Sequence, residues 1–188
     1  MTNGMNLLTM NQISREQPEE ASSTAVGRPR ALGAMRYDAV LVSPVRAADH
    51  LTDQLATLFR RAQYSIATLR CPDPGAPRPP ADTLDQSRIC LVVVPEKVRI
   101  DSTWLWWILG RASAMTRRQA IIPVARRDDA KPLTEFHPRL PTPLQELSYL
   151  GRSRAVGDDQ DSIWVAPPGA PLDTRKAENL EYWIYERD

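Results

Sequence analysis

The sequence predicts one α/β domain built on a doubly wound, mainly parallel sheet. Short apolar runs with strand character alternate along the chain with segments of helical periodicity, an order typical of parallel α/β domains. The run at residues 89–94, Ile-Cys-Leu-Val-Val-Val, is apolar throughout, as expected for a strand covered on both faces. The chain has 188 residues, a length suited to one domain with a sizeable core.

Five strands and five helices follow from this pattern. In the helix over residues 50–64, Leu51, Leu55, Leu58 and Phe59 recur at helical spacing, and prolines 72, 74, 77, 79 and 80 mark a loop. We expect strands at residues 39–43, 65–69, 89–94, 120–125 and 162–166. We expect helices at residues 50–64, 82–86, 102–115, 143–150 and 178–185.

The N-terminal residues 1–35 differ from the rest of the chain. They are rich in Asn, Gln, Ser, Glu and Pro, and residues 14–34 hold few large apolar side chains that could repay the entropy of ordering. We therefore expect a flexible, disordered tail over residues 1–35 and the α/β domain over residues 36–188. The alternative for part of the tail is a short helix at residues 7–13, docked on a partner.

Composition excludes several classes of function. The net charge is +1 and the pI is near 7.8, so no basic field favours nucleic-acid binding. No run of 18 apolar residues occurs and the N-terminus lacks a secretory signal pattern, which predicts a cytoplasmic protein without a membrane span. Two cysteines and two histidines at wide spacing make a structural zinc site improbable.

Candidate binding residues follow the predicted strands. Ligands of open parallel sheets bind at the carboxyl ends of the strands, near the point where strand order reverses. Ser43 and Arg46 follow the first strand, Arg70 the second and Glu96 the third. Arginines here would hold phosphate groups, although polar residues also follow strands simply because loops are solvated. The glycine-rich motifs GxGxxG and GxxxxGK[ST] are absent, as is GxSxG, which disfavours dinucleotide-binding, P-loop and α/β-hydrolase classes.

Five short motifs follow one another along the chain. They are Tyr37-Asp38-Ala39-Val40-Leu41-Val42-Ser43, Arg70-Cys71-Pro72-Asp73-Pro74-Gly75, Ser87-Arg88, Ser102-Thr103-Trp104 and Ile121-Ile122-Pro123-Val124. In this order they resemble the motifs of the Toll/interleukin-1 receptor (TIR) domain family, in its bacterial type. The resemblance covers residues 37–150. It implies a flavodoxin-like fold of five parallel strands in the order 2-1-3-4-5, flanked by helices. It also implies assembly with itself or other TIR proteins through a loop that holds Asp73, Pro74 and Gly75.

Many TIR domains cleave NAD and release nicotinamide, in antiviral defence or virulence, whereas others act only as signalling adaptors. The resemblance makes NAD a substrate or ligand of this chain, with no tightly bound cofactor. A bound nucleotide is expected to contact Ser43, Arg46, Arg70 and Trp104.

One departure from the family pattern bears on catalysis. Cleaving family members carry a glutamate four residues after the tryptophan of the Ser-x-Trp motif, and here that position is Ile108. The reaction develops positive charge on the ribose, which a carboxylate stabilises and an isoleucine does not. The favoured prediction is therefore a signalling or defence module that assembles or senses a nucleotide, with weak or no NAD cleavage. The alternative is an active NAD glycohydrolase or cyclase, yielding nicotinamide and an ADP-ribose-type product, that uses another acid such as Glu96.

Overall fold

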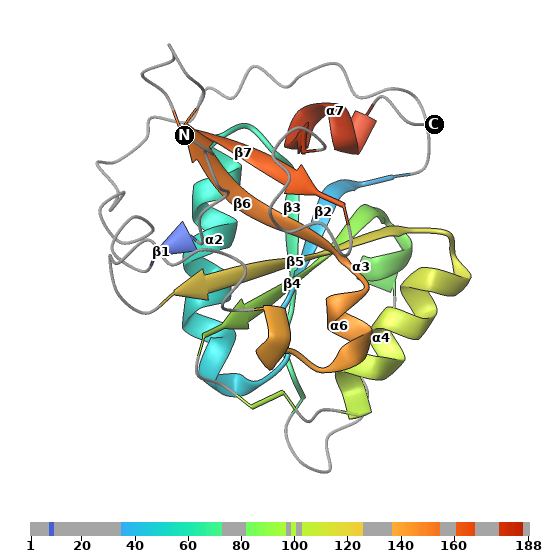
Figure 1. The fold of residues 1–188 in the computed structure, drawn as a ribbon. Helices are drawn as coiled ribbons and strands as arrows, with labels where there is room; N and C mark the ends of the chain where they lie inside the picture. Colours follow the sequence, from blue (N-terminus) through green and yellow to red (C-terminus); the bar gives the residue numbers. More distant parts are fainter. Residues whose placement is uncertain are drawn as a thin grey trace.

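The computed structural model describes residues 8–9, 35–72, 82–96, 99–100, 103–125, 137–154, 161–167 and 177–185 (Figure 1). The strands are β1 (Leu8–Thr9), β2 (Tyr37–Val42), β3 (Ile66–Leu69), β4 (Ser87–Pro95), β5 (Arg118–Ala125), β6 (Ser148–Arg154), β7 (Asp161–Ala166) and β8 (Glu178–Asn179). The helices are α2 (Asp49–Arg61), α3 (Asp82–Asp85), α4 (Thr103–Ala114), α6 (Thr142–Gln145) and α7 (Leu180–Tyr185), with short 3-10 turns η1 (Arg46–Ala48) and η2 (His137–Arg139).

The sheet has a parallel core in the predicted order. The strands lie side by side as β3-β2-β4-β5-β6, all parallel, which is the order 2-1-3-4-5 when these five are numbered along the chain. The sheet then continues with β7 and β8, each antiparallel to its neighbour. The fold is therefore α/β with a parallel core and a mixed sheet. The predicted order of five parallel strands is confirmed for that core, and the predicted total of five strands is too small because β7 and β8 extend the sheet.

The fifth parallel strand is β6, and not the predicted strand at residues 162–166. That predicted strand exists as β7, but it pairs antiparallel with β6, from Tyr149↔Ala166 to Arg154↔Asp161. Only residues 155–160 join the two strands, too few for the crossover that parallel strands need. The helix predicted at residues 143–150 is correspondingly short, because α6 ends at Gln145 and β6 begins at Ser148.

Part of the N-terminal segment joins the sheet. Leu8 and Thr9 form β1, which pairs parallel with Val124 and Ala125 of β5. These two residues are therefore in a strand, whereas the alternative of a helix at residues 7–13 required them to be helical. Apart from them, residues 1–34 lie outside the described part of the chain, and so does the prediction of a disordered tail there.

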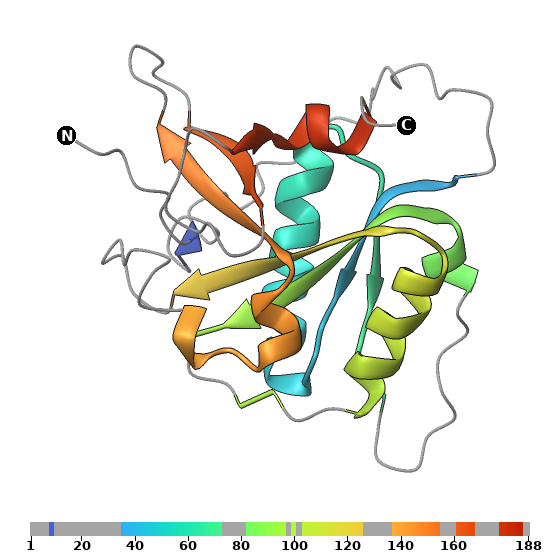
Figure 2. The same ribbon diagram turned by 45° about the vertical axis from the view of Figure 1, so that its right-hand side comes forward.

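Two apolar layers cover the two faces of the sheet, as the alternation of buried side chains along β2 and β4 requires (Figures 1 and 2). Val40, Val42 and Cys90 face the layer that α3, α4 and α6 complete. Leu41 and Leu91 face the layer that α2 and α7 complete. Helices on both faces agree with the predicted doubly wound architecture. No helix within the described residues is long and apolar enough to cross a bilayer.

Pro123 explains why β6 leaves β5 halfway along. The N–H of Glu96 donates to the carbonyl of Val124, 2.9 Å away, so Val124 directs its backbone groups toward β4. Since successive residues of a strand point their backbone groups to opposite sides, Pro123 faces the other edge of β5. A proline there offers no donor, and β6 pairs with β5 only at Ala120 and Ile121. The last residues of β5 are thus left for β1.

Candidate functional site at the carboxyl ends of the parallel strands

The strand order places the candidate site at the carboxyl ends of β2 and β4, which are neighbours in the sheet although β3 lies between them in the sequence. The chain leaves β2 toward β3 on one side, and β4 lies on the other side of β2. In open parallel sheets the carboxyl ends at such a reversal form the usual ligand-binding position. Ser43 directly follows β2 and therefore lies at this point.

Ser43 is committed to local structure. The residue is fully buried, and its hydroxyl donates to the carbonyl of Val45 at 2.8 Å. Its backbone N–H donates to the carbonyl of Leu69, also at 2.8 Å, which ties the end of β2 to the end of β3. The side chain thus shapes the turn into η1, and its one proton is already used within that turn.

The two arginines of the candidate site are exposed. Arg46 begins η1, and Arg70 follows β3. Arg70 pairs with Asp53 of α2, with 2.6 Å between a guanidinium nitrogen and a carboxylate oxygen. The hydrogen bond to Asp53, and then the charge of that carboxylate, raise the pKa of Arg70 above its ordinary value. Arg70 therefore stays charged, and Asp53 offsets part of the attraction that it would offer a phosphate.

Glu96 directly follows β4, and its backbone N–H is directed to β5. Its neighbour Pro95 pairs with Val124, so Glu96 is level with the end of β5. On the other side, Val42 of β2 pairs with Val92, so β4 runs about 10 Å past Ser43 before it reaches Glu96. Glu96 is half-buried. The register therefore places the backbone of Glu96 farther along the sheet than that of Ser43.

Trp104 packs in the core. It lies near the start of α4, is 7% exposed, and belongs to the layer that covers β2 and β4. Its indole N–H is buried and has no hydrogen-bond partner among the described residues. A ring buried to this extent is not placed to stack on a base, so its main contribution is apolar area.

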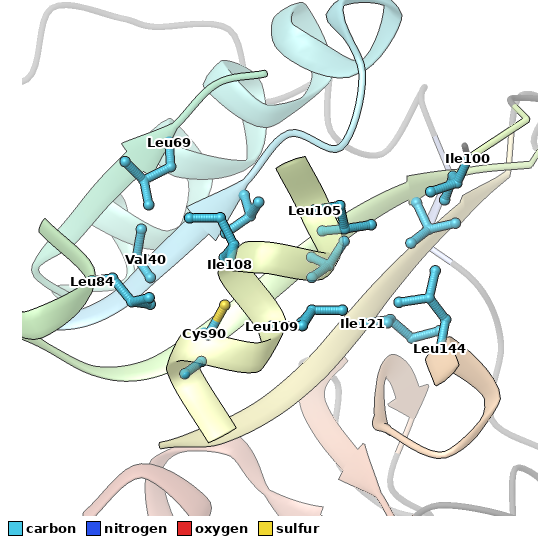
Figure 3. Close-up of a cluster of buried hydrophobic side chains, with 14 of the residues drawn as sticks. Val40, Leu69, Leu84, Cys90, Ile100, Leu105, Ile108, Leu109, Ile121 and Leu144 are labelled. Atoms are coloured by element: carbon cyan, nitrogen blue, oxygen red, sulfur yellow. The ribbon is translucent and has the colours of Figure 1, made fainter. Parts of the chain in front are cut away.

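Ile108 points into the apolar core. The side chain is 1% exposed, and in Figure 3 it lies on the sheet side of α4, among Val40, Leu84 and Leu105. The residues of α4 that are buried are Trp104, Leu105, Ile108, Leu109 and Ala112. A carboxylate at position 108 of this structure would be surrounded by aliphatic side chains, where ionisation is strongly disfavoured. The position expected to carry catalysis by family resemblance serves packing here.

The predicted assembly loop falls outside the described residues. Asp73, Pro74 and Gly75 all lie in the range 73–81, which the structure does not describe. The preceding residues are described, and there Cys71 is half-buried against the α4 layer. The base of the loop is thus anchored on two sides, by Cys71 on that layer and by Arg70 on Asp53.

Two ion pairs among the described residues are not predicted by any pattern in the sequence. One is the partner of Arg70, Asp53 of α2. The other joins Arg111 of α4 to both carboxylate oxygens of Asp85 at the end of α3, at 3.0 and 2.6 Å. Each pair is separated by many residues in sequence, and no periodic signal relates its members. Only the packing of helix on sheet brings them together.

Neither the Cys90 thiol nor the described metal-ligating side chains form a reactive or metal-binding site. Burial raises the pKa of the Cys90 thiol to about 12, which makes this cysteine unreactive at neutral pH. Among the described residues, no group of three or more His, Cys, Asp or Glu side chains is arranged to hold a metal ion.

No protein-family model matches the chain, and no curated protein is similar to it in sequence.

Proposed function

We propose that this chain is a TIR-type, flavodoxin-like interaction module of signalling or defence, which assembles with itself or with other TIR domains and cleaves NAD weakly or not at all. The parallel core in the order 2-1-3-4-5 supports the kinship, because that is the order the resemblance implies. The observation that carries the proposal is the burial of Ile108 in the core. Residues 104–111 contain no acidic residue, so α4 offers no neighbouring carboxylate for ribose chemistry over those positions.

The anchored base of the loop supports assembly as the mode of action. Arg70 is held by Asp53 and Cys71 lies against the α4 layer, so the residues that precede the proposed assembly loop are held at the carboxyl end of β3. A loop that starts from a rigid support presents its residues to a partner at a lower entropic cost.

Substitution in the loop tests assembly. Gly75→Glu and Asp73→Ala should each reduce self-association in light scattering over a concentration series, without lowering the free energy of unfolding. Thr142→Glu is the matched control, because it adds the same charge at an exposed residue in the first turn of α6, where an acid is tolerated. Unchanged association in both loop variants would contradict the proposal.

Glu96 supports a second candidate, an NAD glycohydrolase or cyclase. It is a half-buried carboxylate at the carboxyl edge of the sheet, the usual location of ligands in this architecture. Nicotinamide release that Glu96→Ala abolishes would establish this second candidate.

A further inference from the structure

The edge of β5 beyond Ile121 accepts a strand. β4 covers one edge of β5 as far as Val124, whereas β6 covers the other edge only at Ala120 and Ile121. β6 then turns away to pair with β7 along residues 149–154. An uncovered strand end presents backbone donors and acceptors to any extended segment that reaches it. In this structure Leu8 and Thr9 occupy that place.

The register of β1 suits the proline in this edge. Leu8 pairs with Val124, but the backbone N–H and carbonyl of Val124 are directed to β4. In a parallel ladder with this register, Leu8 therefore bonds to backbone groups of the residues before and after Val124, which are Pro123 and Ala125. From Pro123 it needs only the carbonyl, and from Ala125 only the N–H. The missing N–H of Pro123 is therefore never required, and the edge selects a strand in this register.

The connection to β1 allows the strand to come from another molecule. Residues 10–34 separate β1 from the domain, and a connection of that length reaches up to roughly 80 Å when extended. A domain of this size has a radius of gyration of only about 15 Å. A second copy carries the same strand with the same complementarity to the same edge, so exchange between copies forms no new type of contact.

We propose that β1 is an exchangeable strand: Leu8–Thr9 of one copy pairs with β5 of a second copy, and reciprocal exchange produces a dimer. This inference does not depend on the TIR resemblance. It uses the edge of β5, whereas the proposed assembly loop follows β3, and β2 and β4 lie between these two strands in the sheet.

Two proline variants test the strand. In the observed register the N–H of Leu8 faces β5 and that of Thr9 faces away. Leu8→Pro should therefore detach β1 both from the β5 of its own chain and from that of a second copy, so that nothing holds the exchanged dimer together and the dimer is lost over the concentration range in which the wild type forms it. Thr9→Pro is the matched control and should leave the dimer in place. A chain that is monomeric throughout a concentration series, or a dimer equally insensitive to both variants, would overturn the proposal.

Disulfide trapping distinguishes exchange from pairing within one chain. Chains carrying Thr9→Cys are mixed with differently tagged chains carrying Ala125→Cys, both with Cys71→Ser, and oxidised. Since Thr9 and Ala125 are directly paired, a linked dimer containing both tags is expected, and adding Leu8→Pro should remove it. If a double-cysteine chain links readily within itself while mixed chains never link, β1 pairs only with its own domain and the proposal fails. Gly75→Glu should leave this linkage unchanged. The experiment therefore distinguishes a failure of the proposed strand exchange from a failure of the proposed assembly loop.

Discussion

Ile108 is the residue at which packing and chemistry meet in this chain. Position 108 is where the family resemblance expects a catalytic carboxylate, and the structure fills it with a buried aliphatic side chain. The sequence shows that the acid is missing but not why. The physical reason is the rotation of α4, which places positions 104, 105, 108, 109 and 112 against the sheet.

We predict that Ile108→Glu lowers the free energy of unfolding by about 3 kcal/mol or more, because a carboxylate would enter an aliphatic layer without a partner. Gly110→Glu is the control on the same helix. Gly110 is exposed, nothing lies within 4 Å of an added Cβ, and glycine is unfavourable inside a helix. Urea unfolding of both variants should show a large loss for the first and none for the second. Equal stability of the two would mean that position 108 does not face the core.

Cys90 gives a prediction that depends on pH. Burial raises the pKa of its thiol to about 12, so the folded protein keeps the proton where the unfolded chain loses it. The contribution of the protonated thiol to folding stability is therefore fully present below the ordinary pKa of a cysteine. That contribution then falls, by up to ~1.4 kcal/mol per pH unit, as the pH rises toward 12.

Unfolding free energies of the wild type and of Cys90→Ala, measured from pH 8 upward, isolate this contribution. The variant should be less stable at pH 8, and the difference between the two proteins should shrink as the pH rises. A difference that stays constant across the range would show that the thiol of Cys90 is not shielded in the folded protein.

Strands and helices were predictable where a single periodicity dominates. The runs over residues 39–43 and 89–94 are apolar on both faces and became β2 and β4 in the centre of the sheet. β6 was missed because its residues, Ser-Tyr-Leu-Gly-Arg-Ser-Arg, carry little apolar pattern and follow two prolines that favour a loop or helix start. Once β6 was missed, the antiparallel direction of β7 could not be inferred either, because that direction follows from the short connection between the two.

The ion pair between Asp85 and Arg111 links α3 to α4, and its value is in positioning rather than in stability. Both side chains are more than a third exposed, and the hydrogen bond to Asp85 raises the pKa of Arg111 above its ordinary value. Arg111→Lys should keep the charge but lose the two-point contact. We expect only a small change in unfolding free energy, since solvent screens the pair.

Hydrogen exchange provides the measurement for that pair. Amides of α3 in Arg111→Lys should exchange faster than in the wild type, while those of β2 and β4 should not change. Unaltered protection of α3 would show that apolar packing of Leu84 alone holds the helix in place.

The candidate site was predicted only in part. Reading the strand ends located Arg46 and Arg70 at the carboxyl edge, since loop positions after parallel strands follow directly from the strand pattern. The burial of Ser43 and Trp104 was not predictable, because it depends on how the turn after β2 and the start of α4 pack. The partner of Arg70 likewise depends on the tertiary placement of α2.

Within the molecule as a whole, the two proposed contacts use different parts of the chain. The proposed assembly loop follows β3, which is the outermost strand of the sheet, whereas the proposed exchange uses the end of β5 at which β1 pairs. A chain that assembles through two separate contacts would form extended arrays rather than closed pairs.

We therefore predict that Leu8→Pro combined with Gly75→Glu gives a monomer in light scattering, whereas each single variant retains some association. Identical behaviour of the double variant and the single variants would contradict two independent contacts.

The most direct measurement is nicotinamide release by the purified full chain, incubated with a high concentration of NAD while it is assembled. We predict no release above the level of a heat-denatured sample, both for the wild type and for Glu96→Ala. Steady release by the assembled wild type that disappears in Glu96→Ala would contradict it, because a carboxylate outside α4 would then be performing the chemistry that Ile108 does not support.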